Sequence, residues 1–225
     1  MNKSEKRRLK LSLIPPVFFL LIMWSVKILE YAVNGNWYIY GVLPQTIKGI
    51  PGIFLSPFLH GDFDHLISNS IPFLVLGTGL FYFYRNISYK VFGLIYILTG
   101  FWVWLAARDA YHIGASGIIY GLASFLFFSG LIHRNRNLAS LSLIIVFIYG
   151  SMIWGVLPIV DGMSWESHLF GGITGLILSF AFAKKKIQDT EQIHFTDDDI
   201  NEFCDPDISD NEYIEVHYSY KDDDE

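Results

Sequence analysis

Four polar side chains stand near the beginnings of three apolar stretches of this sequence. They are His65 and Asn69, four residues apart, then Ser116, and finally His168. Ionisable or strongly polar side chains inside apolar helices are costly to bury and are therefore candidates for function. A serine hydroxyl is a weak nucleophile at neutral pH, and a neutral imidazole beside it can accept its proton. The set therefore predicts nucleophilic acyl transfer by a Ser116–His168 dyad.

Acyl transfer also needs hydrogen-bond donors for the oxyanion of its tetrahedral intermediate. Ser116 stands at the start of a predicted helix, where backbone N–H groups have no intrahelical partner. His65 and Asn69 share one helix face because they are four residues apart. Each such donor is worth roughly 3–4 kcal/mol of barrier, and we expect all three groups to form the oxyanion hole. Asp109 and Glu166 lie nearby in the sequence, but neither is assigned as a third member.

The elements that must position these residues are predicted to be membrane-spanning helices. Of 225 residues, 52% are hydrophobic and only 17% are charged, against about 25% charged in a typical soluble domain. Apolar runs of the length that a spanning helix needs lie at 11–33, 64–84, 91–107, 114–131, 138–158 and 165–183. None alternates as a barrel strand does, so the predicted fold is an all-α membrane protein with six transmembrane helices.

Small residues indicate that the spans 114–131 and 165–183 pack closely. Each span carries two glycines four residues apart, a spacing that lets membrane helices approach: Gly117 and Gly121, and Gly171 and Gly175. Such a contact would bring Ser116 within hydrogen-bonding reach of His168, with Tyr120 stacked on the imidazole. The three spans that carry polar residues start on one side of the membrane, which places those residues within about one helical turn of a common depth.

Basic residues predict the orientation of the spans, because they concentrate in cytoplasmic loops. Twelve of the 16 Lys and Arg fall on one side of a six-span topology. We therefore expect both termini in the cytoplasm, with residues 1–10 as a basic N-terminus, 11–183 as the membrane domain and 184–225 as a basic stop followed by a tail. Residues 187–225 hold 15 of the 22 acidic residues and one basic residue, so the tail is expected to be disordered.

Four patches of the sequence resemble the rhomboid family of intramembrane serine proteases in its six-span bacterial core form. The resemblance covers roughly residues 10–185, and the patches in chain order are Pro57-Phe58-Leu59-His60, Asp64-His65-Leu66 with Asn69, Gly114-Ala115-Ser116-Gly117-Ile118-Ile119-Tyr120-Gly121, and Ser167-His168-Leu169-Phe170-Gly171 with Gly175. Any one patch is weak, but their order and their places in the spans make the combination specific. Many members also carry a Trp-Arg pair in the first external loop, whereas Trp37 is followed by Tyr38, which leaves open how residues 34–63 are anchored.

The resemblance implies a complete set of roles. Ser116 would be the nucleophile, His168 the base, His65, Asn69 and the Ser116 amide the oxyanion donors, and Tyr120 the support for His168. Supporting backbone positions would be Gly114, Gly117, Gly121, Gly171 and Gly175. The substrates would be single-span or multi-span membrane proteins, cut in or beside a transmembrane helix in the lipid bilayer, without nucleic acid, metal or cofactor. Span 138–158 and loop 159–164 would be the gate and cap.

We expect a multi-pass protein of a bacterial plasma membrane, with its site near the extracytoplasmic face. Alternatives remain: an inactive rhomboid-like chaperone that binds helices, although such relatives typically lack the Ser or His, and a small transporter, although no repeated halves are visible. A zinc site at His60, His65 and His168 is conceivable. By default His60, His112 and His133 are interpreted as interfacial residues. Lys27 and Glu30, three apart, either pair or extend outward.

Overall fold

The computed structural model describes residues 3–134, 140, 143, 144, 155, 157 and 164–183. In this part of the chain the secondary structure is helical, apart from one isolated antiparallel bridge between Val42 and His112. Most of the predicted span 138–158, the cap 159–164 except its last residue, and the predicted tail lie outside the described residues. The all-helical prediction is confirmed for the part that is described.

The described residues contain five long helices: α1 (Lys3–Ala32), α3 (Phe63–Phe83), α4 (Ser88–Ala106), α5 (Ser116–Ile132) and α8 (Trp165–Ala181). The last four begin and end close to the predicted spans. Helix α1 starts earlier than predicted because its basic N-terminal residues are helical too. Among the described helices, α1, α3 and α4 are long and apolar enough to cross a membrane, and α5 is apolar but shorter.

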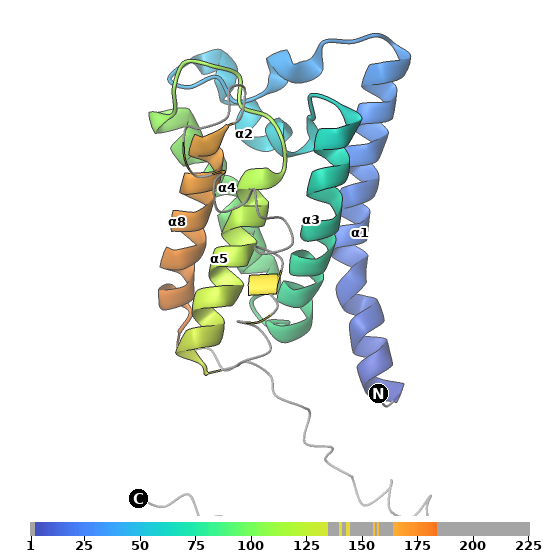
Figure 1. Ribbon diagram of the computed structural model, residues 1–225, viewed down its shortest axis with the longest axis vertical. Helices are drawn as coiled ribbons and strands as arrows, with labels where there is room; N and C mark the ends of the chain where they lie inside the picture. The colour runs from blue at the N-terminus through green and yellow to red at the C-terminus, as the bar shows by residue number, and fades with distance from the viewer. Residues whose placement is uncertain are drawn as a thin grey trace, which may run out of the picture. The chain divides into compact units, whose positions relative to one another are not determined.

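Helix α5 lies at the centre of this bundle, packed against α8, α3 and α4. Figure 1 shows α3, α5 and α8 running in one direction, with their N-terminal ends at the end of the bundle that carries the short helices of residues 37–58. Helices α1 and α4 run the opposite way. The side chains around α5 form one apolar core, which includes Phe73, Leu76, Ile95, Leu122 and Phe125. The three helices with candidate site residues therefore present their N-terminal ends together.

The contact between α5 and α8 is made by glycines, as their spacing predicted. A methyl group added at Gly171 would collide with the carbonyl oxygen of Gly117, and one at Gly175 would collide with that of Gly121. Helix backbones this close leave no room for any side chain on this face. The two glycine pairs therefore fix how near α8 can come to α5 and at which register.

Residues 34–62 form a folded segment that is attached to the helix ends beneath it. Its short helices are η1 (Trp37–Tyr40), η2 (Ile47–Gly49), α2 (Gly52–Leu55) and η3 (Ser56–Phe58). The Gln45 amide donates to the Trp104 carbonyl at 2.8 Å, and the Trp104 indole donates to the Thr46 carbonyl at 2.8 Å. Trp104 at the end of α4 thus anchors the segment, which answers the question raised by the missing Trp-Arg pair.

Lys27 and Glu30 form a buried ion pair at the end of α1, with Nζ 2.8 Å from Oε2. The Lys27 ammonium also donates to the carbonyls of His60 and Gly61, each at 2.9 Å. The other Glu30 oxygen accepts the Trp37 amide at 2.8 Å. The pair therefore holds both the beginning and the end of segment 34–62 to α1, and all three ammonium hydrogens have acceptors.

Candidate active site

Ser116 is the first residue of α5, and the chain approaches it through a glycine with positive φ. Gly114 has φ +104°, a conformation that side chains with a Cβ rarely adopt. Its amide donates to the Ser56 carbonyl at 2.8 Å. Ala115 occupies the N-cap position and has no side chain that could cap α5, so the N–H groups of the first turn need other partners.

Ser116 and His168 are in hydrogen-bonding contact, with Oγ 2.7 Å from Nε2. The other ring nitrogen, Nδ1, lies 2.8 Å from the carbonyl oxygen of Gly155. Because a carbonyl can only accept, Nδ1 must carry the proton and Nε2 must present its lone pair to the Ser116 hydroxyl. His168 is buried and Ser116 is half-buried. The arrangement fixes the tautomer that a general base needs.

Tyr120 stacks face to face on the His168 ring. The ring centroids are 4.2 Å apart and the planes differ by 7°. Tyr120 lies one turn after Ser116 on α5, so the same helix supplies the hydroxyl and the flat surface against which the imidazole rests. The stacking limits rotation of the ring away from Ser116.

His65 and Asn69 lie next to the turn that precedes Ser116. A methyl group added at Gly114 would lie 2.8 Å from His65 Cε1, 2.9 Å from His65 Nε2 and 3.8 Å from Asn69 Nδ2. The Asp62 carboxylate caps α3 and accepts the His65 amide at 2.6 Å, which fixes the first turn of that helix. Asn69 Nδ2 is buried and has no hydrogen-bond partner among the described residues. It is a donor suited to an oxyanion beside Ser116.

His60 is buried rather than interfacial, so the default interpretation of this residue is wrong. Its ring is 2% exposed and packs edge-on against His65 with centroids 5.0 Å apart. Burial first, and then the nearby His65, lowers the pKa of His60 to about 3. The Lys27 ammonium binds the His60 and Gly61 carbonyls and so fixes the backbone that carries the buried ring. His60 is therefore neutral at physiological pH.

The structure gives no support to the zinc alternative. Across the described residues, no group of three or more His, Cys, Asp or Glu side chains is arranged to hold a metal ion. Both ring nitrogens of His168 already have hydrogen-bond partners. His60 and His65 are adjacent rings, and the Asp62 carboxylate beside them accepts the His65 amide as the cap of α3.

Two residues near the site escaped the sequence analysis. Gly155 orients His168 through its backbone carbonyl, and a carbonyl leaves no signature in a sequence. His112 was interpreted as interfacial, but it is 2% exposed and hydrogen-bonded through both ring nitrogens. Its position two residues before Gly114 was the available signal. Glu166 is buried and pairs with Arg108 at 3.5 Å, and the Gly155 carbonyl contacts His168 where a third acidic member would have been expected.

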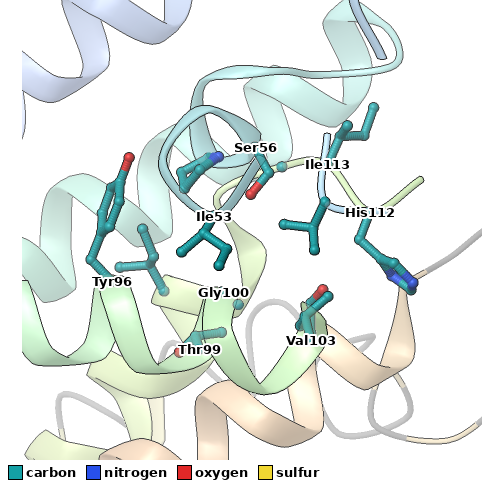
Figure 2. A pocket seen from close by; sticks show the side chains of 14 residues that line it. Ile53, Ser56, Tyr96, Thr99, Gly100, Val103, His112 and Ile113 are labelled. Atoms are coloured by element: carbon teal, nitrogen blue, oxygen red, sulfur yellow. The ribbon is translucent and has the colours of Figure 1, made fainter. Parts of the chain in front are cut away.

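A small pocket lies beside the turn that precedes Ser116, between α4 and segment 34–62 (Figure 2). Its lining includes Ser56, Tyr96, Thr99 and Gly117. The cavity volume is about 20 Å³, which is room for about one water molecule. Figure 2 shows the His112 ring directed away from this pocket, toward the start of α8.

These features define a class of protein. It is a helical membrane protein in which a serine hydroxyl and an imidazole are in contact at the N-terminal ends of two closely packed helices. The Rhomboid domain matches residues 49–185, well over half of the chain. The chain therefore belongs to the rhomboid family, whose members are usually serine proteases that act on membrane proteins. The resemblance of the four sequence patches is confirmed at this level.

Curated relatives agree with this membership at low identity. A Bacillus subtilis protein whose name assigns it provisionally to the rhomboid proteases is 25% identical over 176 residues, covering 74% of this chain and 79% of its own. The Arabidopsis thaliana RHOMBOID-like protein 5 is 28% identical over 133 residues, covering 55% of this chain and 41% of its own. An uncharacterized protein of Mycobacterium tuberculosis is 29% identical over 171 residues, covering 72% and 71%.

Proposed function

We propose that this protein is an intramembrane serine endopeptidase that works through a Ser116–His168 dyad. The observation that carries the proposal is the 2.7 Å contact between Ser116 Oγ and His168 Nε2, made while Nδ1 is bound to the Gly155 carbonyl. In this tautomer only Nε2 of His168 can accept a proton, and the hydroxyl that lies next to Nε2 is that of Ser116. A serine that merely packs a helix has no need of such a partner.

In the proposed reaction, Ser116 Oγ attacks the carbonyl carbon of the scissile peptide bond while His168 Nε2 takes its proton. The negative oxygen of the tetrahedral intermediate is held by the Ser116 amide, Asn69 Nδ2 and the His65 ring. Protonated His168 then gives its proton to the leaving amine, and the C–N bond breaks. Water, deprotonated by His168, hydrolyses the acyl-enzyme ester and frees Ser116.

The proposed substrates are membrane proteins with a single span or several spans. A transmembrane helix hides its carbonyls in internal hydrogen bonds, so the segment to be cut must unwind before Ser116 can reach it. The half-buried position of Ser116 at the end of the bundle suits an unwound segment entering from the membrane edge. We also propose span 138–158 and loop 159–164 as gate and cap.

We propose six spans within 11–183, both termini in the cytoplasm, a tail at 184–225, and a site near the outer face of a bacterial plasma membrane. The basic residues before the first span and after the last support this orientation. Figure 1 shows the N-terminus of α1 and the C-terminal end of α8 at the end of the bundle opposite to the beginning of α5. That arrangement is consistent with a site on the far side from the termini.

The proposal is tested by labelling the detergent-purified full chain with a fluorophosphonate probe. Ser116 Oγ would attack phosphorus and displace fluoride, and His168 would take the proton. Wild type should label, Ser116→Ala should not, and His168→Ala should lose at least about 1,000-fold in rate. If folded wild type labels no better than Ser116→Ala, the protease proposal fails and the helix-binding alternative takes its place.

A further inference from the structure

His112 forms hydrogen bonds through its backbone and through both ring nitrogens, and it lies between the segments that carry Ser116 and His168. Its backbone forms the bridge with Val42 of segment 34–62, with both N–O distances 2.9 Å. Its Nε2 lies 3.1 Å from the Arg108 carbonyl, and its Nδ1 lies 2.6 Å from the Ser164 hydroxyl. The ring is buried, so water does not compete for these bonds.

The proton positions in this cluster follow from the acceptors. The Arg108 carbonyl can only accept, so Nε2 of His112 donates and Nδ1 accepts from the Ser164 hydroxyl. The Ser164 oxygen in turn lies 2.5 Å from the Ser167 hydroxyl, which donates to it. Burial lowers the pKa of His112, which agrees with a neutral ring.

The segments joined here are those that carry Ser116 and His168. His112 stands four residues before Ser116, in the loop that leads into α5. Ser164 is the residue before α8, and its carbonyl accepts the amides of Ser167 at 3.1 Å and His168 at 3.4 Å. The bond from His112 to Ser164 therefore connects the approach to Ser116 with the first turn of the helix that holds His168.

The alternative connection between these segments is weaker. Arg108 and Glu166 form an ion pair at 3.5 Å, and the Arg108 side chain is 44% exposed. The Glu166 carboxylate is buried, but the Arg108 end of the pair is open to water, which weakens the attraction and allows a range of geometries. A buried 2.6 Å hydrogen bond constrains distance and direction much more tightly.

We propose that His112 is a positioning residue: within the register that the glycine contacts set, its bond to Ser164 holds the loop before Ser116 against the first turn of α8 and so fixes the distance between Ser116 and His168. The inference rests on the proposed function, because it assigns His112 a part in the same reaction. His112 touches neither reacting group and acts only by holding the two segments. A displacement of about 1 Å between reacting groups can cost about 100-fold in rate, so loss of this bond should lower the chemical step.

The test uses the full chain in detergent and compares Ser164→Ala, Ser164→Thr and His112→Phe with wild type. The rate of fluorophosphonate labelling is measured against probe concentration, which separates the maximal rate constant from the half-saturating concentration. Ser164→Ala and His112→Phe should lower the maximal rate constant about 10-fold or more at an unchanged half-saturating concentration. Ser164→Thr, which keeps the hydroxyl, should restore the wild-type rate.

A matched control is Ser124→Ala. The Ser124 hydroxyl on α5 donates to the Gly172 carbonyl on α8 at 2.7 Å, so this variant removes a bond between the same two helices away from their beginnings. Its maximal rate constant should equal that of wild type. Thermal unfolding of each variant shows whether it is folded. If His112→Phe does not fold, the comparison of Ser164→Ala with Ser164→Thr tests the inference by itself.

The outcomes separate the inference from the proposed function. If wild type shows no labelling that depends on Ser116, the proposed function fails and the inference fails with it. If wild type is labelled at Ser116, but folded Ser164→Ala has the same maximal rate constant as Ser124→Ala, the inference is overturned and the proposed function is not. Labelling lost in Ser164→Ala and regained in Ser164→Thr supports it.

Discussion

The two halves of the candidate site are held by different physical means. The α3 half, with His65 and Asn69, is secured from outside by a buried ion pair on α1 and by the cap of Asp62. The α5–α8 half, with Ser116 and His168, is secured by glycine contacts and by bonds between neutral groups. The ion pair on α1 holds segment 34–62 in place from outside the site, whereas the close packing of α5 on α8 holds Ser116 and His168 at hydrogen-bond distance. The proposed dyad needs the tighter constraint of backbone packing, and the oxyanion donors tolerate the looser constraint of the ion pair.

The largest effect is expected where packing alone sets the geometry. Gly171→Val adds a branched side chain where even a methyl group collides with the Gly117 carbonyl. Helices α5 and α8 must then separate, the Ser116–His168 contact breaks, and labelling should fall by at least about 1,000-fold. Fluorophosphonate labelling together with thermal unfolding measures this effect.

The neighbouring glycine gives the control for that experiment. A methyl group added at Gly172 meets nothing within 4 Å, so Gly172→Ala should label like wild type. It should also gain about 0.5–1 kcal/mol of helix stability. Equal losses in Gly171→Val and Gly172→Ala would contradict the view that backbone contact sets the register.

The next effect tests the α3 half directly. Asn69→Ala removes a buried donor that has no partner among the described residues, so it should unfold at nearly the wild-type temperature. If Asn69 serves the oxyanion, the rate of peptide hydrolysis should fall about 100-fold to 1,000-fold. The control is Ile67→Ala, at an exposed position of the same helix. An unchanged rate in Asn69→Ala would remove this residue from the oxyanion hole.

A smaller effect on activity, with a large effect on stability, is expected at the ion pair. Lys27→Met leaves the Glu30 carboxylate buried without its cation, which should cost about 3–5 kcal/mol of unfolding free energy. The double variant Lys27→Met/Glu30→Leu removes both charges and should recover much of that loss. Denaturant unfolding in mixed micelles measures both. If the single and double variants are equally destabilised, the pair matters for its packing and not for its charge.

The difference between the two halves of the site also explains which contacts the sequence could predict and which it could not. Glycine spacing and helix periodicity are local patterns, and they predicted the α5–α8 contact and the meeting of Ser116 with His168. Ser116 and His168 are the first and the fourth residues of their helices, and His65 is the third of its helix. All three therefore lie in the first turn, as the depth argument requires, and their depth in a membrane stays a prediction.

Contacts that depend on the path of a loop were not predictable. His60 and His112 looked interfacial because each stands alone near a span end. In the structure the His60 ring packs against His65, and the His112 ring is bonded to the Arg108 carbonyl and the Ser164 hydroxyl. The Gly155 carbonyl has no side-chain signature at all. For Lys27 and Glu30 the spacing allowed a pair, but the acceptors that decide it, the carbonyls of His60 and Gly61, are some 30 residues away.

The smallest effect is a pH dependence that belongs to the α3 half. Burial lowers the pKa of His60 to about 3, so the ring is neutral in the folded protein, whereas in the unfolded chain the pKa of a histidine has its ordinary value of 6.5. Between pH 3 and pH 6.5 the unfolded chain binds a proton at His60 and the folded protein does not. The free energy of unfolding therefore has its full value above pH 6.5 and falls as the pH drops below it. From pH 8 to pH 5.5 the loss attributable to His60 should be about 1.4 kcal/mol.

The variant His60→Gln isolates this contribution, because glutamine keeps a polar side chain without a proton to gain. The charged and titratable groups that face His60 are His65, Lys27 and Asp62, and all three remain. The unfolding free energy of the variant should therefore fall less steeply with pH than that of wild type over the same interval. Parallel curves for the two proteins would mean that His60 gains its proton without opening the fold. The α3 half would then be less tightly closed than the ion pair on α1 implies.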